Sequence, residues 1–209
     1  MRTRIKICGI RDIDSALAAA EAGADAIGLV FAKDSPRFID PDDAFDVMSS
    51  LPPFVSSVGV FRDHSVDDFA DIEELCPTLY SQLHGNEDVR TVKACGPDVI
   101  KAIAFDENTI QADLFKWAAL DEVCAILIDA KSPGAGESFD WKKLEPCIDS
   151  VTTPIIIAGG LTPDNVADCI RILRPWGVDV SSGVERERSV KDEALMQAFC
   201  DAVREADAS

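Results

Sequence analysis

Two kinds of segment alternate along this chain with a regularity that few folds permit. Short apolar runs rich in β-branched residues recur at steps of roughly 20 to 30 residues, about the length of one strand–helix unit. They predict eight strands, at residues 4–8, 26–31, 54–60, 78–83, 99–103, 123–129, 154–158 and 178–181.

Helix-like segments fill the spaces between these strands. Asp40-Pro41 and Thr162-Pro163 each place a capping side chain before a proline, which suits the first helical position, and Ser65 precedes another helix. The predicted helices are residues 13–22, 41–50, 66–75, 87–94, 109–119, 141–148, 163–173 and 191–205.

Strict alternation predicts a parallel sheet, because each crossover between parallel strands contains a helix. Eight units close into a (β/α)8 TIM barrel, and the 209 residues suit a single α/β domain spanning residues 1–209. An open doubly wound sheet is the alternative, but it would normally carry a G-x-G-x-x-G fingerprint after its first strand. Here that strand ends at a single glycine, Gly9, so we expect the barrel.

The charge balance argues against several classes of partner. The 38 acidic and 20 basic residues give a net charge of −18, which disfavours nucleic acid and anionic membranes. No apolar run approaches the roughly 20 residues that cross a bilayer, and no signal peptide is evident, so we expect a cytoplasmic protein. Seven dispersed cysteines and two histidines indicate free thiols and no zinc site. The acidity serves either solubility or adaptation to high salt.

The first predicted strand, RIKIC, alternates apolar and polar side chains. Ile5 and Ile7 suit the face toward the helices, which puts Lys6 and Cys8 inside the barrel, with Cys8 nearest the mouth. A lone cysteine is often only a small apolar residue, but Lys6 beneath it would favour a thiolate. An interior lysine also needs an acidic partner, and Asp179 on the adjoining eighth strand is our candidate.

Asp129 directly follows the apolar run of the sixth strand. TIM barrels catalyse at the C-terminal ends of their strands, so an aspartate at this rim is a candidate general acid or base. Helix capping is the competing role, but the next helix begins only near Asp140. The intervening residues 131–137, KSPGAGE, are typical of a loop that covers a site.

The ends of the last two strands carry glycine and serine. Gly159 and Gly160 follow the seventh strand, and Ser181, Ser182 and Gly183 follow the eighth. Backbone amides at such positions bind phosphate, and barrels often hold a phosphate between these two loops. This predicts an anion site that needs no basic surface.

Two further positions bear on a ligand. Arg37, in the loop after the second strand, offers bidentate geometry for a carboxylate, although a solvated loop arginine is the simpler alternative. Gln82 and His84 alternate with Leu83 and should point inward, where they line the site or satisfy the polar interior of the barrel.

The motifs follow one order from residue 4 to about residue 192: Lys6-Ile7-Cys8-Gly9, Ser35-Pro36-Arg37, Gln82-Leu83-His84-Gly85, Asp129, Phe139-Asp140-Trp141, Ala158-Gly159-Gly160-Leu161 and Ser181-Ser182-Gly183-Val184-Glu185. As a set they closely resemble phosphoribosylanthranilate isomerases of tryptophan biosynthesis. The resemblance implies a (β/α)8 barrel and an Amadori rearrangement of N-(5-phosphoribosyl)anthranilate to 1-(2-carboxyphenylamino)-1-deoxyribulose 5-phosphate, with no metal or organic cofactor.

The resemblance also implies roles for individual residues. Asp129 would act as the general acid that protonates the ribose ring oxygen, and Cys8 as the general base that removes the proton from C2 of the sugar. Arg37 would bind the anthranilate carboxylate, His84 would border the substrate, and the loops after the last two strands would hold the phosphate. Barrels of this type occur as monomers and homodimers.

Residues 185–190, ERERSV, depart from the family, whose members commonly have a Pro-Gly turn there. We expect a more charged and less tightly turned loop, which bears on phosphate affinity. Two other functions compete with the isomerase. The related phosphoribosyl-imidazole isomerase of histidine synthesis generally has an aspartate where this chain has Cys8. A non-catalytic sensor of phosphorylated ligands would have no reason to keep both Cys8 and Asp129.

Overall fold

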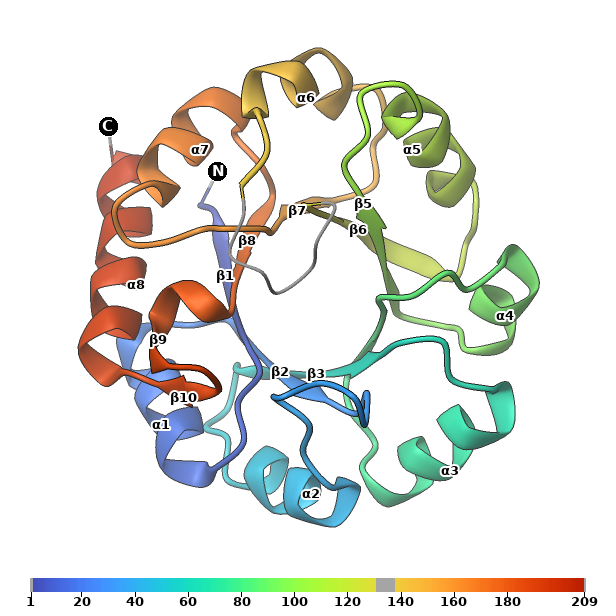
Figure 1. The fold of residues 1–209 in the computed structure, drawn as a ribbon, viewed down its shortest axis with the longest axis vertical. Helices are drawn as coiled ribbons and strands as arrows, with labels where there is room; N and C mark the ends of the chain where they lie inside the picture. The colour runs from blue at the N-terminus through green and yellow to red at the C-terminus, as the bar shows by residue number, and fades with distance from the viewer. Residues whose placement is uncertain (1, 131–137, 209) are drawn as a thin grey trace.

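The computed structural model describes residues 2–130 and 138–208. Within these residues eight parallel strands close into a barrel in which β1 pairs with both β2 and β8. The main helices form a ring outside the strands (Figure 1). The predicted (β/α)8 barrel is therefore confirmed.

The elements agree with the predicted segments to within a few residues at most ends. The strands of the barrel are β1 (Arg4–Cys8), β2 (Ala26–Val30), β3 (Ser56–Phe61), β4 (Tyr80–Leu83), β5 (Val99–Ala104), β6 (Val123–Asp129), β7 (Ile155–Ile157) and β8 (Gly177–Val180). The helices are α1 (Ile13–Ala22), α2 (Pro41–Ser49), α3 (Val66–Leu75), α4 (Val89–Ala94), α5 (Ile110–Ala118), α6 (Trp141–Ile148), α7 (Val166–Leu173) and α8 (Glu193–Ala208). Between β8 and α8 lie a 3-10 turn, η1 (Ser182–Val184), and a hairpin of β9 (Glu185–Glu187) and β10 (Val190–Lys191).

The prediction that the seventh helix begins at Pro163 is wrong. Asn165 folds back so that its side chain accepts a hydrogen bond from the Thr162 N–H at 2.8 Å and donates one to the Gly160 carbonyl at 2.8 Å. Thr162 is thereby held in a turn, and α7 begins at Val166 rather than at Pro163. The same two bonds fix the loop that follows β7.

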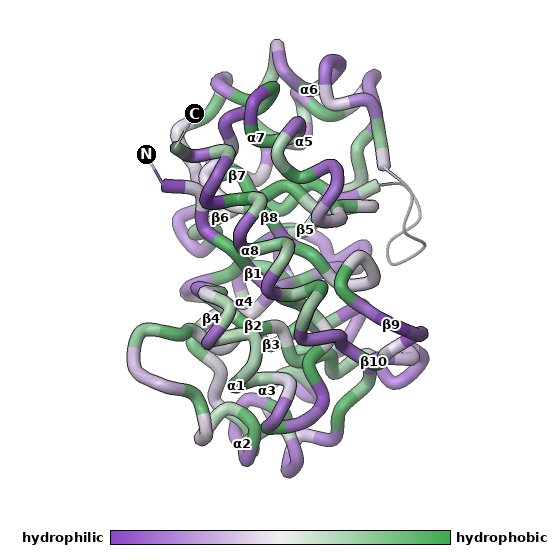
Figure 2. The backbone as a smooth tube through the Cα atoms, turned by 90° about the vertical axis from the view of Figure 1, so that its left-hand side faces the viewer, coloured by the Kyte–Doolittle hydropathy of each residue, from purple (hydrophilic) through white to green (hydrophobic). Residues whose placement is uncertain are grey.

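Alternation along the strands divides the core into two layers. Outward residues such as Ile5 and Ile7 pack against the helices, whereas Cys8, Val58 and Leu127 belong to a separate cluster inside the barrel. In Figure 2 the helices alternate between hydrophilic and hydrophobic colours, and β9 is hydrophilic. No helix within residues 2–130 and 138–208 is long and apolar enough to cross a membrane.

Two buried ion pairs lie within the barrel wall. Lys6 Nζ donates to Asp179 Oδ1 at 2.9 Å across the β1–β8 register, which confirms the predicted partner of Lys6. Lys101 on β5 pairs with Glu87 at 2.7 Å and also donates to the carbonyls of Leu83 and Gly85. These bonds tie the end of β4 to β5.

The Lys101–Glu87 pair yields a stability prediction. Both side chains are 2 % exposed, so Lys101→Met leaves the Glu87 charge buried without its partner. We expect this change to lower the free energy of unfolding by about 3–5 kcal/mol. Lys143→Met, which breaks the exposed Lys143–Glu107 pair, is the matched control and should change the free energy of unfolding far less, because solvent screens an exposed pair. Urea denaturation of both variants measures the two values, and equal losses would contradict the prediction.

Candidate active site

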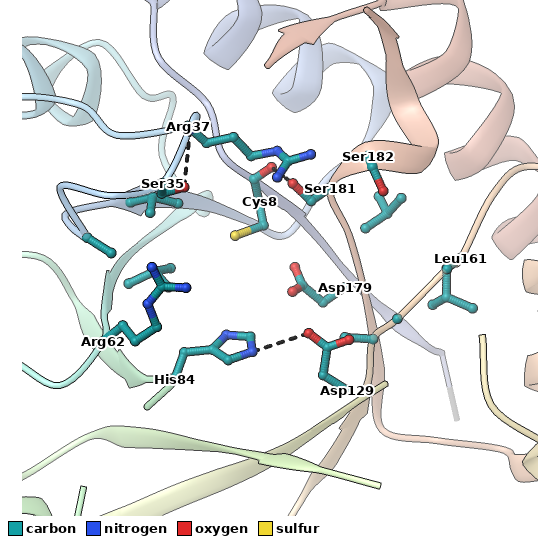
Figure 3. Close-up of a pocket in the computed structure, with 17 residues that line it drawn as sticks. Cys8, Ser35, Arg37, Arg62, His84, Asp129, Leu161, Asp179, Ser181 and Ser182 are labelled. Atoms are coloured by element: carbon teal, nitrogen blue, oxygen red, sulfur yellow. Dashed lines mark hydrogen bonds and ion pairs between the residues drawn. The ribbon is translucent and has the colours of Figure 1, made fainter. Parts of the chain in front are cut away.

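A cavity opens at the C-terminal end of the barrel, where part of the predicted site comes together (Figure 3). Its lining contains most of the residues that the sequence singled out: Cys8, Arg37, His84, Asp129, Gly159, Gly160, Ser181 and Ser182. Gly183 is not among the lining residues. Residues 131–137, the predicted covering loop, lie outside the part of the chain that the structure describes.

Cys8 ends β1 and lines the cavity, where the positive charges of Lys6 and Lys191 act on it. Its carbonyl oxygen accepts a hydrogen bond from Ser181 Oγ at 3.0 Å, which joins the ends of β1 and β8. Burial raises the pKa of the Cys8 thiol, and the positive charges of Lys6 and Lys191 offset only part of that effect. Lys6 thus lowers the pKa of Cys8 as expected, but burial outweighs that effect and leaves the pKa above its ordinary value.

Lys6, paired with Asp179, places an ammonium group beneath Cys8. Burial alone would lower the pKa of Lys6, but the attraction and hydrogen bond of Asp179 oppose it, and that pKa stays above its ordinary value. Lys6 thus remains an ammonium group in the barrel interior. It provides a fixed positive charge near the position where a thiolate would form.

Asp129 ends β6 and faces the same cavity. Its Oδ1 accepts a hydrogen bond from the Ala130 N–H at 2.7 Å, and its Oδ2 lies 3.2 Å from His84 Nε2. Gly159 leaves the space for this carboxylate, because a Cβ built there would lie 2.8 Å from Asp129 Oδ1. Its φ of 84° is also one that glycine adopts without strain. His84 points inward as predicted, and Gln82 beneath it is fully buried.

Arg37 is buried rather than solvated. Its Nε and Nη2 donate to the two carboxylate oxygens of Glu185 at 2.7 and 2.9 Å, and Lys191 Nζ donates to the same carboxylate at 2.9 Å. A guanidinium has five N–H groups, so its Nη1 edge remains for a ligand. The structure describes no hydrogen bond from Arg37 Nη1 to another of its residues. The cluster of two cations and one anion gives this side of the cavity a net positive charge.

The prediction that residues 185–190 form a less tightly turned loop is wrong. Glu187 pairs with Val190 in an antiparallel hairpin, so only two residues form its turn. Ser189 takes a left-handed φ of 70° there. The ion pairs of Glu185 and Lys191 hold the base of the hairpin against Arg37, while the exposed Arg186 and Arg188 do not line the cavity.

The Glu185 cluster predicts an acid-dependent loss of stability. Burial would raise the pKa of Glu185, but hydrogen bonds from Arg37 and Lys191 lower it to about 2, whereas the pKa of an unfolded glutamate is about 4.3. The contribution of Glu185 to the free energy of unfolding is thus fully present above the pKa of the unfolded state. It is lost as the pH falls toward the pKa of the folded state.

We expect the difference in unfolding free energy between the native protein and Glu185→Gln to be constant above about pH 5 and to shrink below it. Urea denaturation from pH 8 to pH 3 measures it. Glu187→Gln, in the exposed part of the hairpin, is the control and should change little at any pH. A Glu185→Gln difference that does not vary with pH would refute the assignment.

The loops after β7 and β8 lie against each other at the cavity. Gly160, Leu161, Ser181 and Ser182 line it. Gly183 packs behind them, since a Cβ built there would lie 1.9 Å from the Leu161 carbonyl oxygen. Glycine at residue 183 therefore permits the contact between the two loops that were predicted to hold phosphate.

Sequence reasoning missed Arg62, which also lines the cavity. It directly follows β3 and forms an ion pair with Asp34 of the loop after β2. The predicted third strand ended one residue early, at Val60, and so gave Arg62 no place at the rim. Within the described residues no group of three or more His, Cys, Asp or Glu side chains is arranged to hold a metal ion.

Comparison with known proteins identifies the family of this chain. The family model described as N-(5'phosphoribosyl)anthranilate (PRA) isomerase matches residues 5–202. The chain belongs to the phosphoribosylanthranilate isomerase family.

Individual relatives agree with this assignment. The N-(5'-phosphoribosyl)anthranilate isomerase of Leptothrix cholodnii is 44% identical over 214 residues, which cover 99% of this chain and 93% of the relative. A structure of monomers of the dimeric isomerase from Thermotoga maritima is 33% identical, with a TM-score of 0.86, and covers 97% of this chain and 99% of that one. Another phosphoribosylanthranilate isomerase, in complex with reduced 1-(o-carboxyphenylamino)-1-deoxyribulose 5-phosphate, is 35% identical, with a TM-score of 0.86 and the same coverage.

Proposed function

We propose that this protein converts N-(5-phosphoribosyl)anthranilate to 1-(2-carboxyphenylamino)-1-deoxyribulose 5-phosphate in tryptophan biosynthesis, the reaction of its family. One observation carries the proposal: a carboxyl group and a thiol, Asp129 and Cys8, face one cavity from β6 and β1. An Amadori rearrangement needs one group that gives a proton to oxygen and another that takes a proton from carbon.

Asp129 is the general acid. It protonates the ribose ring oxygen, the bond from that oxygen to C1 breaks, and the anthranilate nitrogen forms a Schiff base with C1. The Ala130 N–H, which bonds Asp129 Oδ1, stabilises the carboxylate that remains.

Cys8 is the general base. It takes the proton from C2 of the open-chain sugar, and the resulting enolamine tautomerises to the ketone. Because burial raises the pKa of the thiol, the single proton that the pair holds must pass from Cys8 to Asp129 when substrate binds, which leaves Cys8 as the thiolate. The cationic Schiff base, together with Lys6, then favours the anion.

Arg37, His84 and the last two loops bind the substrate. The Nη1 edge of Arg37 takes the anthranilate carboxylate, while Glu185 holds the opposite edge of the guanidinium. The backbone and hydroxyl groups of the loops after β7 and β8 take the phosphate. The free cysteines of the chain suit a cytoplasmic enzyme, which acts as a monomer or a homodimer.

The test is turnover of freshly generated phosphoribosylanthranilate, followed by the loss of anthranilate-type fluorescence. The native protein should consume it at rates typical of enzymes, about 1–10³ per second. A folded protein that turned over only the phosphoribosyl-imidazole substrate would be the isomerase of histidine synthesis instead. Binding of phosphorylated ligands without any turnover would favour the sensor.

A further inference from the structure

Gln82 lies on β4 inside the barrel, and the proposed reaction gives it no role. Its side chain is 0 % exposed, and it is not among the residues that line the cavity. Its amide nitrogen Nε2 lies 2.8 Å from Nδ1 of His84. A buried amide thus contacts the imidazole ring that faces the proposed general acid.

This contact determines where the neutral ring of His84 carries its proton. An amide nitrogen can only donate, so Nδ1 must accept and the proton must lie on Nε2. The opposite orientation of the amide would exchange its two ends. In the observed orientation Gln82 Oε1 has no hydrogen-bond partner among the described residues. In the opposite orientation the amide N–H groups would take the position of Oε1 and lack a partner instead. Unpaired buried N–H groups are rarer than unpaired acceptors, which favours the observed orientation.

The other ring nitrogen lies beside Asp129. His84 Nε2 lies 3.2 Å from Asp129 Oδ2 (Figure 3) but makes no hydrogen bond to it among the described residues, while the Ala130 N–H donates to Oδ1 at 2.7 Å. With the proton on Nε2, an N–H group lies close to each oxygen of the carboxylate, and a small rotation of the ring would let the second one bond. Such donors interact more strongly as negative charge develops, which happens when Asp129 gives up its proton.

We propose that Gln82 is a positioning residue of the isomerase: it fixes the Nε2–H tautomer of His84 and thereby keeps a hydrogen-bond donor beside Asp129 for the moment when that group becomes a carboxylate. The catalytic part of this inference rests on the proposed role of Asp129 as general acid. The tautomer of His84 does not depend on that role and can be measured without turnover.

The first experiment is NMR of protein labelled with 15N-histidine, at about pH 8, where free imidazole is neutral. The chain has two histidines, so a His64→Gln variant assigns both rings. His64 is an internal control, because its Nδ1 accepts from the backbone N–H of Arg62 at 3.2 Å. Native His84 should carry its proton on Nε2. Gln82→Glu, whose carboxylate can only accept, should move it to Nδ1 and leave His64 unchanged.

The second experiment is kinetic. Gln82→Met should lower kcat by about 10- to 100-fold, since a hydrogen bond to a charged group is lost from the transition state. KM should change less than kcat, because Gln82 does not line the cavity and reaches the substrate only through His84. If Gln82 acts through His84, the double variant Gln82→Met/His84→Asn should have the same kcat as His84→Asn alone.

Three results would overturn the proposal: a native His84 with its proton on Nδ1, a Gln82→Met enzyme with kcat within about twofold of native, or additive losses in the double variant. If Gln82→Met fails to fold, the native tautomer and Gln82→Glu decide instead. A native protein without turnover would refute the proposed function and the catalytic part of this inference. The NMR experiment would still determine the tautomer of His84.

Discussion

Asp129→Asn is expected to lower kcat with phosphoribosylanthranilate by about 10²- to 10⁴-fold, the range for loss of a positioned general acid. Asparagine preserves the size of the side chain and an oxygen that can accept from the Ala130 N–H. It has no carboxylic proton to give to the ring oxygen. KM should change little, since the substrate is held mainly by Arg37 and the last two loops. Steady-state fluorescence kinetics measures both constants.

Asp140→Asn provides the matched control for this variant. Asp140 caps α6 by accepting from the Lys142 N–H, and asparagine caps helices as well as aspartate does. Its kcat should stay within about twofold of native. If Asp129→Asn retained more than a tenth of native kcat, the ring oxygen would have to receive its proton from another group.

Cys8→Ser is the second variant with a large expected effect, again a loss in kcat of about 10²- to 10⁴-fold. A serine hydroxyl is a far weaker acid than a thiol, so the anion needed to take the proton from C2 does not form. Cys169→Ser is the control, because that thiol is buried against helices outside the barrel interior. It tests whether any cysteine replacement lowers activity through folding alone.

The pH dependence of kcat/KM gives an independent check on Cys8. The working pair must hold one proton in total, on Asp129, with Cys8 as the thiolate. Above the thiol pKa both groups are deprotonated and kcat/KM falls. Because burial raises the pKa of Cys8, we expect that fall only above about pH 9 in the native enzyme, and not at all in Cys8→Ser over the same range. A native profile that declined between pH 7 and pH 8 would contradict the assignment.

Closure of the barrel explains which parts of the site could be predicted. The alternation of strands and helices implies that β1 and β8 are neighbours, and this adjacency was enough to pair Lys6 with Asp179. Position at a strand end was likewise enough to bring Asp129 and Cys8 to one cavity. Both inferences depend on backbone periodicity, which local sequence determines well.

Contacts between loops could not be predicted in the same way. Arg37 and Glu185 are 148 residues apart, and their pairing depends on how far two side chains reach from separate loops. The hairpin that carries Glu185 turns at Arg188 and Ser189, which are not the residues that usually mark such turns. Arg62 was missed for a smaller reason, a strand end misplaced by one residue.

The Arg37–Glu185–Lys191 cluster also fixes when during its synthesis the protein completes one side of its cavity. The chain emerges from the ribosome N-terminal end first, so Cys8, Arg37 and Asp129 are all made long before Glu185 and Lys191. Until those last two residues emerge, Arg37 lacks the carboxylate that holds its guanidinium and the lysine beside it. The nascent chain therefore completes this side of the cavity only within the final stretch of translation.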